Sequence, residues 1–358
     1  MIYWPFFYCS NTLFSIILYK MFNKKNSDLV FGNTFKRYSK KEMIEFIEPF
    51  KIRFKKNNIN SKKLFKKKKC LDLGCGNGRG GVFMSMNNAK DITFSDISKI
   101  NINKSKAVIK MFGKKATVDN SPCEKLKIKN SVYDFIWCNG VIMHTEYPSK
   151  TLKELHRVLK PGGQSWIYVY GCGGLWWLTI NAIRKFLKNI STVRTIKELI
   201  RLKYSNRYLA EYLDDWKVKN LRKYDNKLFI KALKIVGFEK IKKIDRGLDY
   251  DTSEKLYMTK NKKIYGNGDL RYLVTKSKKR KENKKSIKFL DSSHEKKELK
   301  LKKFQNILNL IFYKKNRPIK EKITIAAKIQ FELRQATNKK IFREEDFYNF
   351  LCNINSSY

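Results

Sequence analysis

Short apolar runs alternate with amphipathic or polar segments between residues 70 and 276 of this chain. The runs are rich in β-branched and aromatic residues, which is typical of buried strands. The segment 149–159 places Leu152, Leu155 and Val158 on one helical face, and Pro-Gly-Gly at 161–163 is a helix stop signal. Strands and helices that alternate in this way predict an α/β domain with a parallel, doubly wound sheet. The predicted strands are residues 70–73, 92–95, 116–118, 133–138, 165–170 and 270–275.

Five segments differ in composition from these alternating elements. Residues 1–25 are apolar and aromatic, and they predict either a membrane anchor or a stretch that precedes the true start of translation. Apolar residues at helical spacing predict helices over 26–65 and over an insertion at 171–224. Residues 277–303 form a lysine-rich linker, and residues 304–358 predict a small helical tail.

The most specific pattern is D-x-G-x-G-x-G at residues 72–78, directly after the first strand. Glycine adopts positive φ and has no Cβ, so this backbone can turn tightly and let a ligand lie against it. The helix expected to start near Arg79 adds unpaired N–H groups at its first turn. Unlike the G-x-G-x-x-G of dinucleotide enzymes, the pattern places an acid, Asp72, beside the ligand. It favours a ligand with a cationic amino group, and a strand–turn–helix junction without a ligand is the alternative.

Two further polar residues follow the ends of predicted strands. Asp96 comes about twenty residues after the glycines, where nucleotide-binding folds place an acid that accepts the ribose hydroxyls. Asn139 follows the fourth strand. Because open α/β sheets bind ligands at the carboxyl ends of their strands, we expect both side chains to lie near the glycine loop.

Taken together, these patterns resemble the class I S-adenosylmethionine-dependent methyltransferases, and most closely the subfamily with a glycine motif, an EKL turn and the run RVLKPGG. The resemblance covers about residues 68–172 and resumes at 225–245, where a helix and a sixth strand are expected. It implies a Rossmann-like, doubly wound, seven-stranded α/β/α sandwich over residues 66–276, with a helical insertion on the substrate side and a helical C-terminal tail. It also implies that segment 26–65 is a lid over the cofactor. The segments that carry it are 71–78, 123–126, 139–145 and 157–163.

The resemblance assigns S-adenosylmethionine as the cofactor and gives individual residues a role. The glycine loop would meet the methionine part through its backbone, and Asp72 would support the ammonium group. Asp96 would accept the ribose hydroxyls, Ile97 would cover one face of the adenine, and Asn139 would line the methyl end. The implied cofactor-binding residues are Asp72, Gly74, Cys75, Gly76, Asn77, Gly78, Asp96, Ile97, Cys123 and Asn139.

One position departs from the family pattern. Where relatives often carry an acid that accepts from the adenine amino group, this chain has Pro122. Proline has neither an accepting side chain nor an amide N–H. We therefore expect adenine contacts from the backbone of Cys123, or from Ser121 and Asn120.

His144 is the candidate catalytic residue, because the loop after the fourth strand lies over the transferred methyl in this family. The chemistry is an in-line transfer of an activated methyl group, so positioning the acceptor is the main requirement. A base is needed only when the acceptor must lose a proton. A base and a structural brace for the loop are equally consistent with the sequence.

The signatures of base, ribose and cytosine methylases are missing after the fourth strand, where the chain reads Asn-Gly-Val-Ile at 139–142. This predicts a small-molecule, lipid or glycan acceptor. Insertions at 171–224 cover the acceptor side in this family, so polar and aromatic residues there are candidates for lining the substrate pocket, with plain helix packing as the alternative. They are Trp176, Trp177, Asp214, Asp215 and Trp216.

The formal net charge of +47 is compatible with an RNA substrate. However, the chain has 15 Arg among its 79 basic residues, whereas nucleic-acid surfaces rely on Arg. Residues 70–175 carry a net +7 and residues 276–358 a net +14, which is typical of a solvated lysine tail. An RNA methyltransferase and a non-catalytic binding protein on the same scaffold are therefore the alternatives to a small-molecule enzyme.

Seven cysteines are scattered without a C-x-x-C pair, which predicts a reducing compartment, no disulfide framework and no metal site. Basic residues follow the apolar segment 2–19, so a membrane anchor there would leave the catalytic part in the cytoplasm. We therefore expect a cytoplasmic protein, with membrane association through residues 2–19 if they form an anchor.

Overall fold

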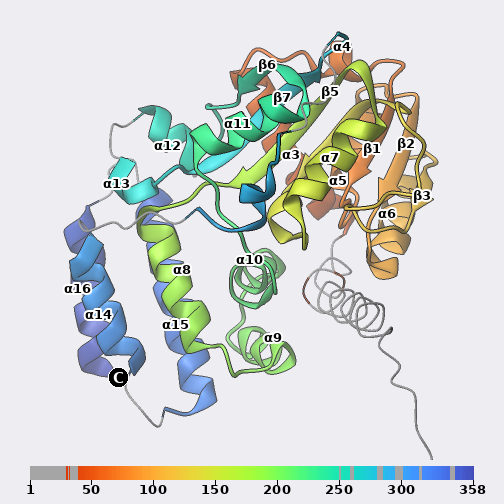
Figure 1. The fold of residues 1–358 in the computed structure, drawn as a ribbon. Coiled ribbons are helices and arrows are strands. Elements are labelled where there is room, and N and C mark those ends of the chain that lie inside the picture. The colour runs from red at the N-terminus through yellow and green to blue at the C-terminus, as the bar shows by residue number, and fades with distance from the viewer. Residues whose placement is uncertain are drawn as a thin grey trace, which may run out of the picture.

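The computed structural model describes residues 30, 32, 39–249, 251–258, 262–279, 285–294, 301–313, 317–338 and 343–358. The apolar segment predicted at 1–25 and part of the linker predicted at 277–303 lie outside the described residues. The fold is built on one central sheet (Figure 1). Its strands are β1 (Lys69–Leu73), β2 (Asp91–Ser95), β3 (Thr117–Asp119), β4 (Tyr133–Asn139), β5 (Leu159–Tyr170), β6 (Phe238–Lys243) and β7 (Asp269–Lys276).

The seven strands lie in the order β3-β2-β1-β4-β5-β7-β6. Strands β3, β2, β1, β4 and β5 pair in parallel, and β7 pairs antiparallel with β5 and β6. The chain runs outward from β1 to β3 and then returns to the other side of β1 at β4. Ligands bind at the carboxyl edge beside such a switch point. The predicted doubly wound, seven-stranded fold is confirmed.

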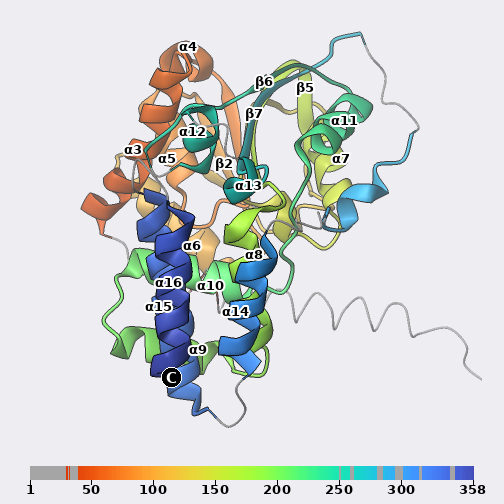
Figure 2. The ribbon, with the colours of Figure 1, turned by 90° about the vertical axis from the view of Figure 1, so that its left-hand side faces the viewer.

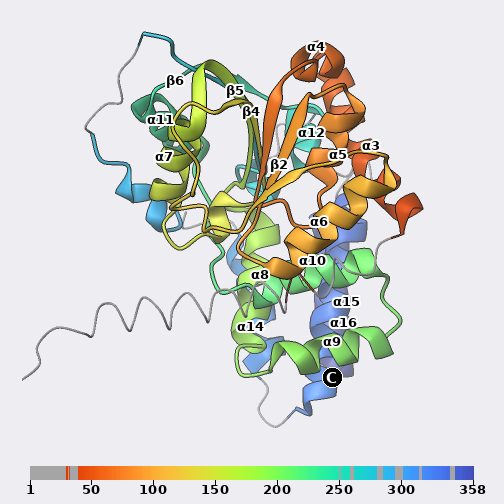
Figure 3. The ribbon, with the colours of Figure 1, turned by 90° about the vertical axis from the view of Figure 1, so that its right-hand side faces the viewer.

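Helices cover both faces of this sheet (Figure 3). They are α3 (Lys40–Lys56), α4 (Ser61–Phe65), α5 (Arg79–Met86), α6 (Lys99–Met111), α7 (Pro148–Val158) and α11 (Asn226–Val236), with α12 (Thr252–Met258), α13 (Lys262–Tyr265) and the short 3₁₀ helices η2 (Ile142–His144) and η3 (Lys288–Asp291) in the connections. Phe135 and Trp137 of β4 pack with α3, α5 and α6, whereas Ile136 and Cys138 pack with α7 and α11. Alternate strand residues point to opposite faces, so a strand covered on both sides is continuously apolar.

Pro-Gly-Gly at 161–163 does not lie at the end of the helix, where the sequence predicts it. The helix ends at Val158, and β5 begins at Leu159, so Pro-Gly-Gly lies inside the strand instead of between helix and strand. The physical reason is that Leu159 already pairs with Tyr133 of β4, and the register then shifts before Phe135 pairs with Gln164. Such an irregularity accommodates a proline in a strand.

The insertion and the C-terminal tail form a second, all-helical layer, which occupies the lower half of Figure 2. Its helices are α8 (Gly174–Phe186), α9 (Thr192–Arg201), α10 (Asn206–Lys217), α14 (Lys302–Tyr313), α15 (Ile319–Asn338) and α16 (Glu344–Ser357). These six helices share one hydrophobic core, to which Leu187 and Leu213 contribute from the insertion and Ile323 and Leu351 from the tail. None of the helices that the structure describes is long and apolar enough to cross a membrane.

Candidate functional site

A cavity of about 280 Å³ lies at the carboxyl ends of β1, β2 and β4. It brings together residues that the sequence separates by more than sixty positions. Of the ten cofactor residues implied by the resemblance, eight line it: Gly74, Cys75, Gly76, Asn77, Asp96, Ile97, Cys123 and Asn139. The other two, Asp72 and Gly78, do not line it.

The glycine loop needs its glycines for two different reasons. Gly74, Gly76 and Gly78 have φ values of 64°, 53° and 81°, a left-handed conformation that L side chains rarely adopt. At Gly74 an added Cβ would also lie 2.5 Å from the side chain of Val141, which lines the same cavity. At Gly78 it would meet Ser105 of α6 at 3.0 Å, so this glycine serves helix packing.

Asp72 supports the loop from behind. Its Oδ2 accepts a hydrogen bond of 2.7 Å from the backbone N–H of Gly81, in the first turn of α5. Burial raises the pKa of Asp72 to about 8, although the Gly81 N–H and the Arg79 guanidinium act to lower it. The carboxyl group therefore holds the start of α5, and its contact with a ligand ammonium stays a prediction.

Asp96 lines the cavity and joins two loops. Its Oδ2 accepts from the backbone N–H of Gly76 at 3.0 Å and from Asn101 Nδ2 at 3.2 Å. Its Oδ1 accepts from the backbone N–H of Ser98 at 2.8 Å. The side chain thus ties the glycine loop to the start of α6, which fixes the direction in which its carboxylate faces the cavity.

The far end of the cavity is lined by Ile97, Pro122 and Cys123. Neither alternative adenine contact, Asn120 or Ser121, lines the cavity. The amide of Asn120 donates to the backbone of Asp96 and Ile97, and Ser121 is 1% exposed. Burial raises the pKa of the Cys123 thiol, so this group is not poised as a nucleophile.

A chain of hydrogen bonds forms the opposite wall. His144 Nδ1 lies 2.9 Å from the backbone oxygen of Asn220, so Nδ1 carries a hydrogen. His144 Nε2 lies 3.3 Å from Asp214 Oδ1, and the Tyr170 hydroxyl donates to Asp214 Oδ2 at 2.6 Å. Burial and the nearby Asp214 carboxylate raise the pKa of Tyr170, which keeps the phenol a donor. Tyr170 and Asn220 are functional candidates that the sequence reasoning missed, although Tyr170 ends a predicted strand.

A second cavity of about 810 Å³ adjoins the first. The two share Asn77, Arg79, Asn139, Tyr168, Tyr170 and Asp214 in their walls. Four of the predicted substrate residues line it: Trp176, Trp177, Asp214 and Asp215. The prediction that Trp216 lines the substrate pocket is wrong, because Trp216 lines neither cavity and is 4% exposed in the helical core. Helix α10 turns its indole toward α15, where Nε1 donates to Gln330.

The C-terminal tail also reaches this second cavity. Leu333, Arg334 and Thr337 of α15 line it. Arg334 forms an ion pair with Glu211 of α10, and its guanidinium lies 5.2 Å from the centre of the Trp176 ring. The second cavity therefore has a wall made by α15 residues that lie more than a hundred positions after the insertion in the chain, and no local sequence pattern predicts this contact.

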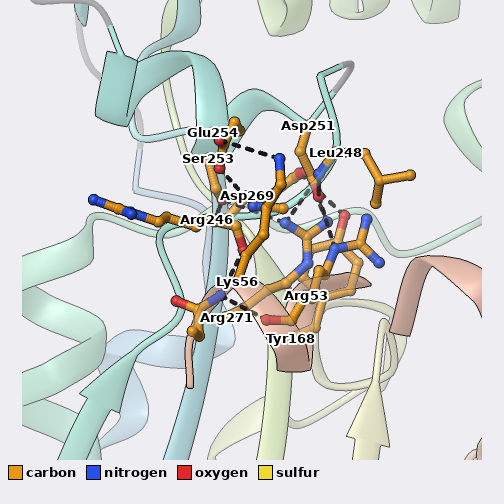
Figure 4. A network of polar contacts seen from close by, with 12 residues as sticks. Arg53, Lys56, Tyr168, Arg246, Leu248, Asp251, Ser253, Glu254, Asp269 and Arg271 are labelled. Carbon is orange, nitrogen blue, oxygen red and sulfur yellow. Dashed lines mark hydrogen bonds and ion pairs between the residues drawn. The ribbon is translucent and has the colours of Figure 1, made fainter. Parts of the chain in front are cut away.

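A buried ionic network closes the other side of the second cavity (Figure 4). Asp251 accepts from Arg53 Nε at 2.7 Å and from Arg271 Nη1 at 2.8 Å. Arg271 Nη2 donates to Asp269 at 2.9 Å, and the Arg271 guanidinium lies 4.5 Å from the centre of the Tyr168 ring. Burial alone would raise the pKa of Asp251, but the two guanidinium groups hold it well below its usual range. The network attaches α3 to β7 and to a tyrosine that both cavities share.

Comparison with known proteins identifies the central part of the chain. Residues 71–167 match the family model described as a methyltransferase domain. The chain is 31% identical over 97 residues to a sarcosine/dimethylglycine N-methyltransferase of Aphanothece halophytica, a match that covers 26% of this chain and 35% of that protein. It is 31% identical over 104 residues to a phosphoethanolamine N-methyltransferase of Arabidopsis thaliana, covering 28% of this chain and 21% of that protein.

A solved S-adenosylmethionine-dependent methyltransferase from Mesorhizobium loti aligns with 60% of this chain and 93% of its own, at 14% identity and a TM-score of 0.40. The matches to the two N-methyltransferases span 35% and 21% of the length of those proteins, which is about a third or less. Residues 71–167 are thus similar to a methyltransferase domain, and the matches support S-adenosylmethionine as the cofactor. Among the residues that the structure describes, no group of three acidic, histidine or cysteine side chains is arranged to hold a metal ion.

Proposed function

We propose that this chain is an S-adenosylmethionine-dependent methyltransferase that methylates the nitrogen of a small-molecule amine. The observation that carries the proposal is the junction of the two cavities. The glycine loop and Asp96 line one cavity, aromatic and acidic residues line the other, and Asn139, Tyr170 and Asp214 lie where they meet.

The residues of the first cavity fit this cofactor. The close approach of Gly74 to Val141 leaves a backbone surface that any side chain at position 74 would fill. Asp96 presents a carboxylate to the cavity in a fixed orientation, as a ribose diol requires. When bound, the cofactor supplies a sulfonium-activated methyl group, so the chain has to orient an acceptor and manage its proton.

The residues around the junction suit a cationic acceptor. Asp214 supplies a carboxylate, and the rings of Tyr170 and Trp177 lie with their centroids 5.0 Å apart in the same wall. A carboxylate beside aromatic faces binds an ammonium group by charge and by cation–π attraction. The names of the two sequence relatives, which act on amines, support the same class of acceptor.

An ammonium acceptor must lose one proton before its nitrogen has a lone pair. The pair formed by His144 and Asp214 is placed to take it, because Nδ1 donates to Asn220 and Nε2 lies 3.3 Å from Asp214 Oδ1, so these two atoms can share one added proton. In this scheme the proton leaves the acceptor nitrogen for the His144–Asp214 pair. The freed electron pair would form the new N–C bond as the methyl–sulfur bond breaks and its electron pair stays on the sulfur. His144 then acts together with Asp214, not as a single base.

The first test is a calorimetric titration with S-adenosylmethionine. Gly74→Ala should abolish binding, because its Cβ would meet Val141 within the cofactor cavity. Gly113→Ala is the matched control: Gly113 has a similar φ of 69°, but an added Cβ would meet nothing within 4 Å. Both variants carry a comparable backbone cost of about 1–2 kcal/mol, so only the cavity distinguishes them. Wild-type protein that takes up no cofactor at millimolar concentration would leave the chain a binding protein on this scaffold.

The second test offers acceptors of different classes to the cofactor-loaded wild type. Mass spectrometry should detect a mass increase of one methyl group on small amines. Transfer only to RNA, to a glycan or to a lipid would contradict the proposed acceptor class while leaving the cofactor assignment intact.

A further inference from the structure

We propose that Arg53 forms an anion-binding subsite in the second cavity, and that the acceptor is therefore an amine that also carries a carboxylate or phosphate group. This inference rests on the proposed function and narrows its substrate class. It makes Arg53 a specificity-determining residue contributed by the N-terminal helix α3.

The hydrogen bonding of Arg53 is incomplete in a way that points to a ligand. Its side chain is only 9% exposed, and it lines the second cavity. Nε donates to Asp251, whereas the two terminal nitrogens have no partner among the described residues (Figure 4). Guanidinium presents its donors as a planar fork that matches the paired oxygens of carboxylates and phosphates. A nearly buried fork with open donors on a cavity wall is therefore suited to bind such an anion.

The network behind Arg53 fixes the direction of this fork. Asp251 holds Nε, and Asp251 is itself held by Arg271. Both acids of the network, Asp251 and Asp269, are already paired with arginines. Lys255 of α12 lines the same cavity, as do Glu42, Glu45 and Glu48 of α3, and Glu48 is paired with Lys51. A ligand anion would meet a preorganised donor set, which reduces the entropy lost on binding.

The cavity thus has two ends of opposite character. At one end, Asp214 accepts from Tyr170 and faces the junction with the cofactor cavity. At the other end lie Arg53 and the ionic network. Tyr168 and Tyr170 connect them, with ring centroids 5.7 Å apart and the Arg271 guanidinium against Tyr168. An acceptor with an ammonium at one end and an anion at the other would satisfy both walls together.

A buried donor set rejects ligands that lack its partner, because its own groups are then left unpaired. An amine without an anionic group would leave the fork of Arg53 without a ligand partner in this cavity. Carboxylate and phosphate share the chemistry that the fork recognises, and the experiment separates the two.

The test measures acceptor binding by calorimetry in the presence of saturating S-adenosylhomocysteine, using two matched pairs of probes. Glycine is compared with glycinamide, and O-phosphoethanolamine with ethanolamine. The wild type should bind the member of at least one pair that carries the carboxylate or phosphate tenfold or more tightly than the analogue that lacks this group. The pair that shows the difference identifies the anion.

Arg53→Gln should reduce this preference to less than threefold while cofactor binding is kept. Lys55→Gln is the matched control, because Lys55 is an exposed cation on the same helix that lines neither cavity, and its loss should leave the preference unchanged. If Arg53→Gln does not fold, Arg53→Lys keeps the charge but not the fork, and its preference should fall at least severalfold.

Equal affinities within both pairs for the wild type would overturn the inference, whether all four probes bind or none does. A preference that survives in the folded Arg53 variants would also overturn it. Failure of the proposed function has a different signature, since it would appear as absent cofactor binding or absent methyl transfer and not as a lost preference between probes.

Discussion

The two cavities are built in opposite ways. The walls of the first cavity, which we call the cofactor cavity, come mainly from one stretch, residues 74–146. In this stretch successive loops follow successive strands of the sheet. The walls of the second cavity, which we call the acceptor cavity, come from elements that include α3, α8, α10, α12, β7 and α15. The lining residues extend from Glu42 to Thr337. A site made by neighbouring loops depends on local backbone conformation, whereas a site made by distant helices depends on tertiary packing.

The polar groups of the two cavities differ in the same way. In the cofactor cavity, Asp96 is held by backbone N–H groups of Gly76 and Ser98, which the fold of the loops supplies. In the acceptor cavity, carboxylates are held by side chains from other elements, as Asp251 is by Arg53 and Arg271. The comparison indicates that the acceptor cavity is the part of this protein that substitutions change most easily.

The largest difference between the two cavities is expected when α15 and α16 are removed. A chain that ends at Tyr313 loses buried apolar side chains that include Ile323, Ile329, Leu333, Phe347 and Leu351. At about 1.5–3 kcal/mol each, this approaches the entire stability of a typical domain, roughly 5–15 kcal/mol. We expect α8, α9 and α10 to lose protection from hydrogen exchange while β1, β2 and β4 keep theirs. Unchanged protection of α8 to α10 would show that the insertion folds without the tail.

Asp214→Asn should weaken acceptor binding and leave cofactor binding unchanged. The amide can still accept from Tyr170, but it lacks the charge that attracts an ammonium group. A charge-assisted hydrogen bond contributes roughly 1.5–3 kcal/mol, so we expect KM for an amine acceptor to rise tenfold or more with cofactor affinity unchanged.

Asp215→Asn is the control for this prediction, because Asp215 lies next to Asp214 on the same helix. Burial raises the pKa of Asp215 well above its usual value, which disfavours its charged form, and its oxygen accepts from Gln330. Its replacement should leave KM nearly unchanged. Equal effects of both variants would indicate that packing, and not charge, explains the loss.

A further effect is expected in the pH dependence of stability. Burial raises the pKa of Asp72 from 3.8 to about 8, so between these values the folded state holds a proton that the unfolded chain has released. The stability from this group is fully present below its unfolded pKa and is lost as the pH rises toward about 8, by at most ~1.4 kcal/mol per pH unit. Denaturant melts of Asp72→Asn at several pH values should lack this decline.

The pH dependence of stability that Asp251 contributes in the acceptor cavity should have the opposite sign. Its pKa is held below the usual range by Arg271 and Arg53, against the effect of burial. Its contribution is therefore present above the unfolded pKa and is lost as the pH falls below it. Asp251→Asn should remove stability at neutral pH and flatten the acid limb. Matching slopes for the two variants would contradict this contrast between the cavities.

The accuracy of the sequence-based predictions follows the same division. The strands and the glycine loop were predictable because short continuous apolar runs and the need for positive φ leave a local signature, as at Gly74. Trp216 was assigned to the substrate pocket because helical spacing does not reveal which neighbour a helix faces, and α15 covers it. The role of Arg53 left no signal, because its partner Asp251 lies 198 positions away in the chain.

The sequence by itself determined the order of strands and helices, the glycine loop and the carboxylate that follows β2, since each depends on residues close together in the chain. Only the tertiary structure decided that the tail completes the acceptor cavity, that Asp214 meets His144, and that Arg53 turns an open fork toward a ligand. The physical reason is that burial and ion pairing between distant segments depend on how helices pack, and many packings satisfy the same apolar pattern.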